Sequence, residues 1–136
     1  PEAMEVRNIH LQKKYEEIKA NEVRYESMHV DDADYIIVAF GSAARVSEKA
    51  IEIAHEEGLS LGLFRPITLW PFPEKEIKAL AENKKGILVV EINAGQMVED
   101  VRLAVNGALP VEHFGRLGGI VPEPEEIVNA LKEKLL

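Results

Sequence analysis

The sequence predicts an α/β fold, a three-layer α/β/α sandwich around a mostly parallel sheet. Short runs of strand-forming residues alternate along the chain with segments of helical periodicity, and this alternation is typical of parallel sheets covered by helices. Two of the runs, 35–40 and 87–90, are continuous and apolar, as expected of strands covered on both faces. The length of 136 residues is that of a single domain with one substantial core.

The chain begins with a predicted helix and a predicted edge strand. Residues 3–20 are expected to form the helix, because Leu11, Tyr15 and Ile18 recur at i, i+4 and i+7 and give a narrow apolar stripe. The segment 21–28 contains a short run of strand formers, which we interpret as an edge strand.

A crossover unit follows. The strand 35–40 leads through a Gly41-Ser42 turn into a helix over 43–57, and Gly58 is a natural stop for that helix. The next strand is expected over 59–64. An order of strand, helix, strand predicts a right-handed parallel crossover.

The second half of the chain continues the alternation. Three prolines make the segment 65–73 stiff, because each fixes a backbone angle and removes a hydrogen-bond donor. The expected elements beyond it are a short helix that begins near Pro73, a strand from 87 to 93, a helix over 97–106, a strand over 111–114 and a last helix that begins at 122–124.

Composition excludes several classes of function. The net charge of −8 argues against sequence-independent binding to nucleic acid or to anionic membranes. No apolar run approaches the roughly 20 residues that a membrane span needs. The absence of cysteine excludes disulfides, thiolate nucleophiles and cysteine-ligated metal sites, and it fits a cytoplasmic location. The chain begins with proline instead of methionine, so we expect a processed product or an excised piece.

Polar residues and glycines gather where the predicted strands end. The carboxyl ends of parallel strands meet at one edge of a sheet, where ligands and partners are met. The glycine-serine turn offers free amides to an anion at a helix N-terminus, with the serine as helix cap. The candidate residues at this edge are Ser42, Arg45, Arg65, Asn93, Gly95, Gln96 and Arg116. They predict a docking surface or a weak anion site instead of an assembled active site.

One strand delivers Glu91, Asn93 and Gln96 to this edge without a spacer. Nothing beside them in the sequence supplies a nucleophile or a cofactor ligand. We therefore interpret the segment 93–96 as a polar turn that fixes the next helix.

Other motifs have a structural interpretation beside a functional one. The acidic loop 29–34 is either a metal site or a solvated turn before a strand. The four histidines lack the spacing for a shared metal, and His113, near a strand end, is the one placed for chemistry. Trp70 and Phe72 either cap the sheet or face a partner.

Four segments together carry a family resemblance. They are IVAFGS at 37–42, FRPITLWPFP at 64–73, VVEINAGQM at 89–97 and GRLGG at 115–119. In this order and spacing, the chain from about residue 32 to 136 resembles the C-terminal domain of the alpha subunit of 2-oxoacid:ferredoxin oxidoreductases. The resemblance implies a transketolase C-terminal-like fold, with a five-stranded sheet of order 1-3-2-4-5 and an antiparallel first strand at 23–26. Residues 1–30 would then be a connector helix with the edge strand, and 31–136 the α/β domain.

The family oxidatively decarboxylates a 2-oxoacid on thiamine diphosphate, passes electrons through iron–sulfur clusters to ferredoxin and transfers the acyl group to coenzyme A. The resemblance implies that thiamine diphosphate, its magnesium and the clusters are held elsewhere in the complex, and that this domain holds no cofactor and no catalytic residue. The implied role is a non-catalytic assembly domain, inactive alone, whose partners are the other alpha-subunit domains and the beta-, gamma- or delta-type subunits. The 2-oxoacid, whether pyruvate or another, is not encoded here.

Two other interpretations stay open. One is a free-standing flavodoxin-like module that binds a nucleotide or an anion at the edge formed by Gly41-Ser42 and 93–96. The other is a homo-oligomer formed through a surface meant for a neighbouring domain.

Overall fold

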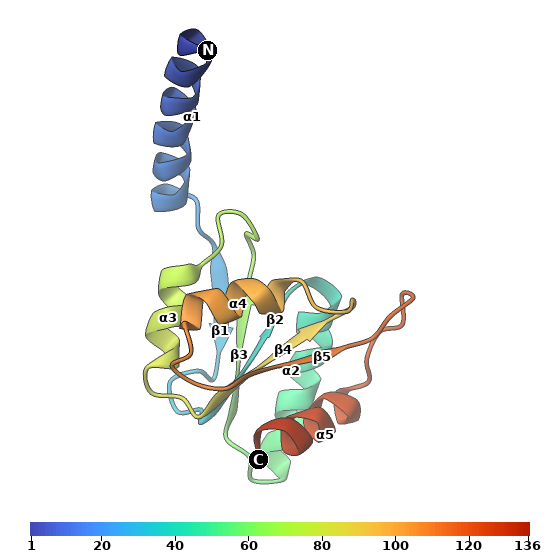
Figure 1. Ribbon diagram of the computed structural model, residues 1–136. Helices are drawn as coiled ribbons and strands as arrows, with labels where there is room; N and C mark the ends of the chain where they lie inside the picture. The colour runs from blue at the N-terminus through green and yellow to red at the C-terminus, as the bar shows by residue number, and fades with distance from the viewer.

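The computed structural model describes residues 1–136 and has the alternation that the sequence predicts (Figure 1). The helices are α1 (Glu2–Asn21), α2 (Gly41–Glu56), α3 (Glu74–Ala81), α4 (Met97–Val105) and α5 (Pro124–Leu135). The strands are β1 (Tyr25–Met28), β2 (Tyr35–Ala39), β3 (Leu61–Pro66), β4 (Gly86–Glu91) and β5 (Val111–Gly115). Every predicted helix and strand is present. None of the helices combines the length and the apolarity that crossing a membrane requires.

The five strands form one sheet in the order β1-β3-β2-β4-β5. β1 is antiparallel to β3, and the other three pairs of neighbours are parallel. The order and the directions implied by the family resemblance are therefore confirmed. β1 begins two residues later than the expected 23–26, because β3 ends at Pro66, opposite Tyr25, and offers Val23 and Arg24 no strand partner.

Arg24 instead joins the chain to the loop that follows β3. Its carbonyl accepts hydrogen bonds from the amides of Ile67 (2.9 Å) and Thr68 (3.1 Å). Its own amide donates to Oγ1 of Thr68 at 3.0 Å. The base of α1 is thereby tied to the proline-rich segment.

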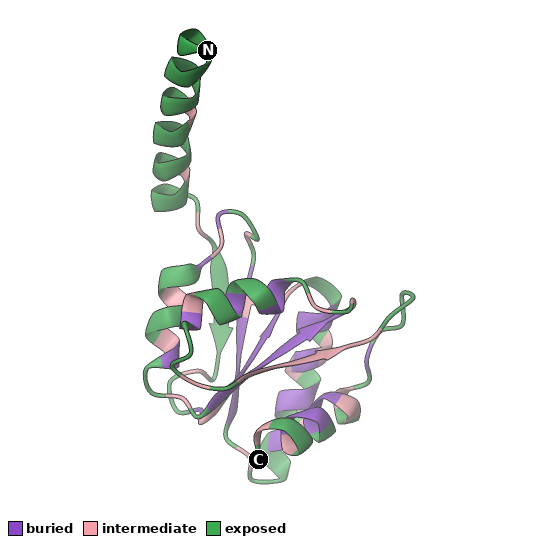
Figure 2. Ribbon diagram, in the orientation of Figure 1, coloured by how far each residue is buried: buried purple, intermediate pink, exposed green.

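The sheet separates two apolar cores, because successive side chains of its central strands point to opposite faces. Ile37 and Leu88 pack with α2 and α5, whereas Ile36 and Ile87 pack with α3 and α4. Figure 2 shows the central strands buried and the helices buried on their inner sides. This is the predicted three-layer sandwich.

β4 ends at Glu91 and not at residue 93, and two further predicted boundaries are wrong for local reasons. α2 begins at Gly41, so Ser42 lies inside its first turn; Phe40 is the cap residue and no side chain caps the helix. β3 begins at Leu61 and not at Leu59, because the Leu59 amide closes α2 by donating to the Ala54 carbonyl at 2.8 Å.

α1 stands apart from the sandwich (Figures 1 and 2). None of its residues is buried. Near its carboxyl end the Tyr15 ring meets the Trp70 ring edge-on, with 5.7 Å between centroids. The predicted stripe of Leu11, Tyr15 and Ile18 therefore exists on a helix that has little of this chain to pack against.

Candidate functional site

The candidate residues lie at the carboxyl ends of β2, β3, β4 and β5, in two groups and one separate position. Ser42, Arg45 and Arg65 line one depression, together with Gly41 and Glu48. Asn93, Gly95 and Gln96 form the turn between β4 and α4. Arg116 follows β5 and pairs with a side chain of α5.

The depression lies over the N-terminus of α2, where Gly41 adopts a φ of 58°. Ser42 and Arg45 are exposed, and Arg45 has no ion-pair partner. Arg65 is half-buried and its Nη1 lies 3.1 Å from Oε2 of Glu26 in β1. The unpaired guanidinium and the first amides of the helix give this depression the capacity to attract an anion, whereas Glu48 on its wall opposes it.

Glu91 is the centre of the turn. It is the last residue of β4, its side chain is fully buried, and its carboxylate accepts hydrogen bonds from backbone amides at the start of α4. The donors are the amides of Met97 (2.8 Å), Val98 (3.2 Å) and Gln96 (3.2 Å). A negative charge at a helix N-terminus is stabilised both by these bonds and by the helix dipole. The strand end thus caps the helix that follows it.

Asn93 completes the turn. Its Oδ1 accepts a hydrogen bond from the Gly95 amide at 2.7 Å, and its Nδ2 donates to Glu91 Oε1 at 3.2 Å. Gly95 has a φ of 111°, which favours glycine. The side chain of Gln96 is exposed and makes no hydrogen bond within the chain, so it is the member of the turn that is free to meet another molecule. The prediction that this turn fixes the next helix agrees with these bonds.

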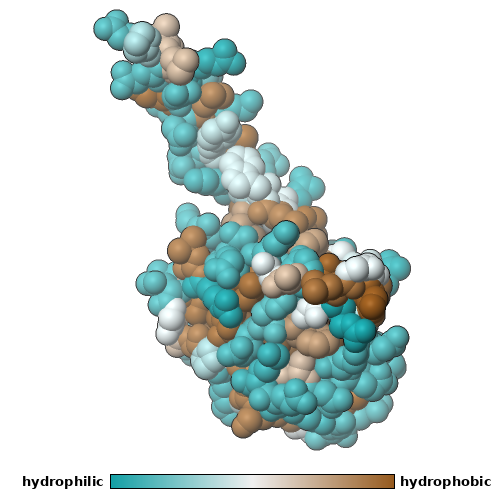
Figure 3. Space-filling model, turned by 45° about the vertical axis from the view of Figure 1, so that its right-hand side comes forward, coloured by the Kyte–Doolittle hydropathy of each residue, from teal (hydrophilic) through white to brown (hydrophobic).

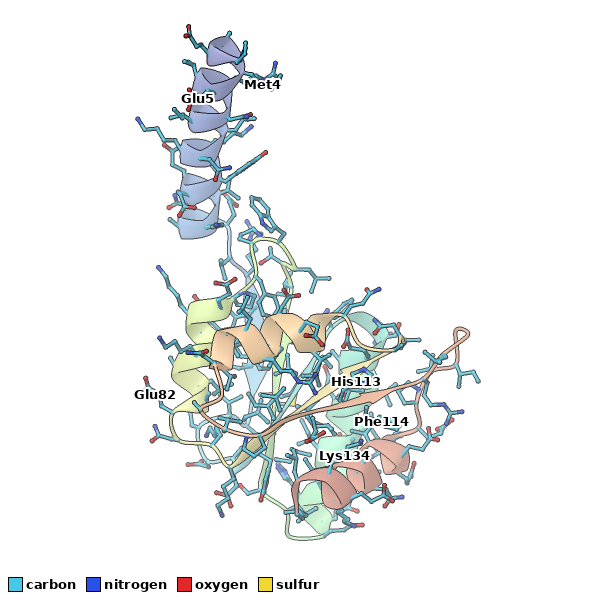
Figure 4. The ribbon with its side chains drawn as sticks, viewed as in Figure 1. Met4, Glu5, Glu82, His113, Phe114 and Lys134 are labelled. Carbon is cyan, nitrogen blue, oxygen red and sulfur yellow. The ribbon has the colours of Figure 1, made fainter.

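His113 lies on β5 beside the N-terminal end of α4 (Figure 4). Its Nε2 is buried without a hydrogen-bond partner and stands 3.5 Å from Oε2 of Glu91. Gly115 explains the tight fit, because a Cβ there would stand 2.2 Å from the Asn93 carbonyl oxygen and 2.7 Å from Cε1 of His113. The histidine is wedged against the turn, and it adds no nucleophile or base that faces open solvent.

Arg116 is held away from the depression. It forms an ion pair with Glu126, whose other oxygen accepts a hydrogen bond from the Glu123 amide at 2.9 Å in the capping box of α5. The guanidinium thereby fixes the loop after β5 to the start of the last helix.

The acidic loop before β2 is held by a lysine. Lys84 Nζ donates to the carbonyls of Val30 (2.5 Å), Ala33 (2.8 Å) and Asp31 (3.2 Å). No three His, Asp or Glu side chains anywhere in the chain converge as metal ligands would. No cysteine is present to ligate an iron–sulfur cluster.

The two aromatic residues of the proline-rich segment take different places. Phe72 packs against the core under α3 and α4, whereas Trp70 is 56% exposed and touches Tyr15. Phe72 therefore caps the sheet and Trp70 faces outward.

Sequence reasoning missed the capping role of Glu91 and the anchoring role of Lys84. The signal for Glu91 was a carboxylate that directly follows a buried apolar run and precedes a helix without a capping side chain. Lys84 had no such signal, because its three acceptors lie more than 50 positions away in the sequence.

Comparison with known proteins identifies the family of this chain. Residues 33–127 match the family model described as pyruvate:ferredoxin oxidoreductase core domain II. The chain is 44% identical over 126 residues to the ketoisovalerate oxidoreductase subunit VorB of Methanothermobacter thermautotrophicus, which covers 93% of this chain and 36% of VorB. It is 39% identical to the 2-oxoglutarate synthase subunit KorA of Methanothermobacter marburgensis, over 74% of this chain and 27% of KorA. The chain thus spans about a third of the length of such relatives.

Solved structures agree with the family match. The 2-oxoglutarate:ferredoxin oxidoreductase from Magnetococcus marinus, solved with 2-oxoglutarate, coenzyme A and succinyl-CoA bound, superposes with a TM-score of 0.84 at 27% identity. The match covers 100% of this chain and 24% of that one. A split-gene transketolase, an inactive beta4 tetramer, matches with a TM-score of 0.69 at 17% identity, over 82% of this chain and 41% of the other. The fold is therefore transketolase-like, as expected.

Proposed function

The chain belongs to the pyruvate:ferredoxin oxidoreductase core domain II family, and from that premise we propose that it is a non-catalytic assembly domain of a 2-oxoacid:ferredoxin oxidoreductase alpha subunit. In this role residues 31–136 are the α/β domain, and residues 1–30 supply its edge strand β1 and the helix that connects it to the rest of the subunit. Thiamine diphosphate, magnesium and the clusters belong to other domains and subunits of a cytoplasmic complex. The oxidation of the 2-oxoacid and the transfer to coenzyme A take place there.

The observation that supports this role is that several polar side chains at the strand ends already have partners within the chain. Glu91 and Asn93 make hydrogen bonds within the turn and with the start of α4, and Arg116 forms an ion pair with Glu126. The groups left exposed at this edge are Ser42, Arg45 and Gln96. A hydroxyl, a guanidinium and an amide suit recognition of a neighbouring protein surface better than acid–base or covalent catalysis.

A chimeric subunit tests the proposal. In it, the segment of Methanothermobacter thermautotrophicus VorB that aligns with this chain is replaced by this chain, and the subunit is assembled with the other subunits of that oxidoreductase. We expect the chimera to oxidise ketoisovalerate within about tenfold of the unmodified enzyme, because 44% identity preserves most packing. VorB with the segment deleted is the matched control and should be inactive.

Two results would contradict the proposal. One is oxidation of ketoisovalerate by the isolated chain, which would place catalysis within it. The other is full activity of the deletion control, which would show that assembly does not need the domain.

The depression over α2 favours a second candidate, a nucleotide- or anion-binding module. Its basis is Arg45, which has no ion-pair partner beside the first amides of the helix. Thermal unfolding with inorganic phosphate, coenzyme A or nucleotides tests it, since a ligand at 100 times its dissociation constant adds about 2.7 kcal/mol of stability. A rise in the unfolding temperature that Arg45→Gln abolishes would support the module, and no rise with any of these ligands would refute it.

A further inference from the structure

A small cavity opens between the carboxyl ends of β2 and β4, and we call it the switch-point cavity. The helices that follow these two neighbouring strands cover opposite faces of the sheet, α2 over the core around Ile37 and α4 over the core around Ile36 (Figure 1). Parallel neighbours whose connections leave to opposite sides form a topological switch point, which is where open α/β sheets bind ligands. The position of the cavity is therefore that of a binding site.

The size of the cavity limits what it can hold. Its volume is about 140 Å³. Pockets for drug-sized ligands have roughly 300–1,000 Å³, so a nucleotide does not fit and a molecule of a few non-hydrogen atoms does.

The walls of the cavity are apolar. Phe40 follows β2, Leu69 and Phe72 belong to the proline-rich segment, and Met97 is the first residue of α4. Both phenylalanines are half-buried, whereas Leu69 is 46% exposed. Figure 3 shows apolar side chains at the surface where α1 joins the body, which is the region of the proline-rich segment. Aromatic side chains attract organic cations, and they are the walls on which proteins hold alkylated ammonium ions.

The polar residues that line the cavity supply negative charge and no positive charge. They are Glu91, Gln96 and Asp100, and no lysine, arginine or histidine lines the cavity with them. Asp100 is exposed and forms no ion pair. The Glu91 side chain is fully buried, so it acts on the cavity through its field, which is weakly screened there. A cation is favoured over an anion.

The groups that are free to bind suit an ammonium ion. An alkylammonium nitrogen donates up to three hydrogen bonds. The Asp100 carboxylate and the side-chain oxygen of Gln96 are available to accept them, because neither makes a hydrogen bond within the chain. A hydrated metal ion would need further oxygen ligands, and the apolar walls do not offer any.

We propose that the switch-point cavity binds the aliphatic ammonium group of a small ligand. The nitrogen lies toward Asp100 and Gln96, and the alkyl chain lies against Phe40, Leu69 and Phe72. An ammonium group of this kind comes from a free alkylamine or from a lysine side chain. The site goes beyond the assembly role of the domain and does not depend on it. It is opposite in charge preference to the depression over α2.

Titration of the full chain with n-butylammonium chloride, followed by the NMR shifts of the Gln96, Met97 and Asp100 amides, tests the proposal. We expect a dissociation constant of about 1–10 mM, as suits a ligand of about five non-hydrogen atoms. Methylammonium should bind at least about tenfold more weakly, because each buried CH₂ that it lacks contributes about fourfold. n-Butanol and butyrate keep the chain but remove or reverse the charge, and each should bind at least about fivefold more weakly at equal ionic strength.

A matched pair of variants locates the charge. Asp100→Asn should raise the dissociation constant of n-butylammonium by about fivefold, because it removes the one exposed carboxylate that lines the cavity. Glu99→Gln removes the same charge from the same helical turn, but Glu99 does not line the cavity, so its effect should stay below about twofold.

The other outcomes decide the source and the site. Tighter binding of Nα-acetyl-lysine amide than of n-butylammonium assigns the site to a lysine side chain, whereas equal or weaker binding assigns it to a free amine. An absence of shifts up to about 100 mM n-butylammonium overturns the proposal. Equal affinities for n-butylammonium, n-butanol and butyrate overturn it as well, and so do equal effects of the two substitutions.

Discussion

Replacing Glu91 by glutamine tests whether the carboxylate at the end of β4 holds the start of α4. The substitution preserves the shape of the side chain and removes its charge. The charged form interacts with the helix dipole, which contributes about 1–2 kcal/mol in a buried geometry. The new amide group also turns an N–H toward the amide of Met97 or Val98, and leaving a buried donor unsatisfied costs about 1–2 kcal/mol more. The expected loss of unfolding free energy is about 2–4 kcal/mol.

Urea unfolding at neutral pH measures this loss. With a slope near 2 kcal/mol per molar, the midpoint should fall by about 1–2 M, and the slope itself should not change. Glu99→Gln is the matched control, because Glu99 lies in the same first turn but is exposed and pairs with Arg102 at 3.4 Å. Its loss should stay below about 1 kcal/mol. Equal losses in the two variants would mean that the buried carboxylate is not what fixes the helix.

Three further predictions concern the turn and the sheet. Gly115→Ala should lower the free energy of unfolding by about 1–3 kcal/mol, since its Cβ would lie 2.2 Å from a backbone atom. The loss should be larger than that of Gly86→Ala, whose Cβ would meet only the flexible end of Leu135. Equal urea midpoints for the two variants would contradict this. Alanine at both Asn93 and Gln96 should weaken assembly of the chimeric subunit with its partners by about tenfold while the circular dichroism spectrum is preserved, and unchanged affinity would refute a contact there. Asp34 raises the pKa of Lys85 through a hydrogen bond and its charge. The pair therefore contributes its full stabilisation below pH 10.5 and loses it as the pH rises through the folded pKa. The free energy of unfolding of Lys85→Met should be lower than that of the parent at neutral pH and should converge with it in strong alkali.

Strand and helix identities follow from local pattern, and the sheet order does not. The apolar runs of β2 and β4 and the helical spacing in α5 depend on residues close together in sequence, so they are readable without a structure. The antiparallel placement of β1 depends on pairing across about 40 positions, and here it came from the family resemblance. Where a predicted end of an element was wrong, backbone hydrogen bonds set the actual end, as at Leu59 and Phe40.

The position of the candidate residues at the strand ends could be predicted from the sequence, but their hydrogen bonds and ion pairs could not. Parallel strands brought Ser42, Arg45 and Arg65 to one depression, as the strand-end rule predicts. Which charges are satisfied internally could not be read from the sequence. The pairing of Arg116 with Glu126 depends on how α5 approaches the loop after β5, which is a matter of tertiary packing.

The hydrogen bonds at Arg24 have a mechanical consequence. They tie the foot of α1 to Ile67 and Thr68, three residues or fewer from Trp70, so the helix and this loop share one anchor. α1 is about 30 Å long, so a force on its far end acts at that distance from the Arg24 anchor, which lies at the end of the β1–β3 pairing. Any tilt of α1 would therefore act on the Trp70 loop through these hydrogen bonds, at the antiparallel edge of the sheet.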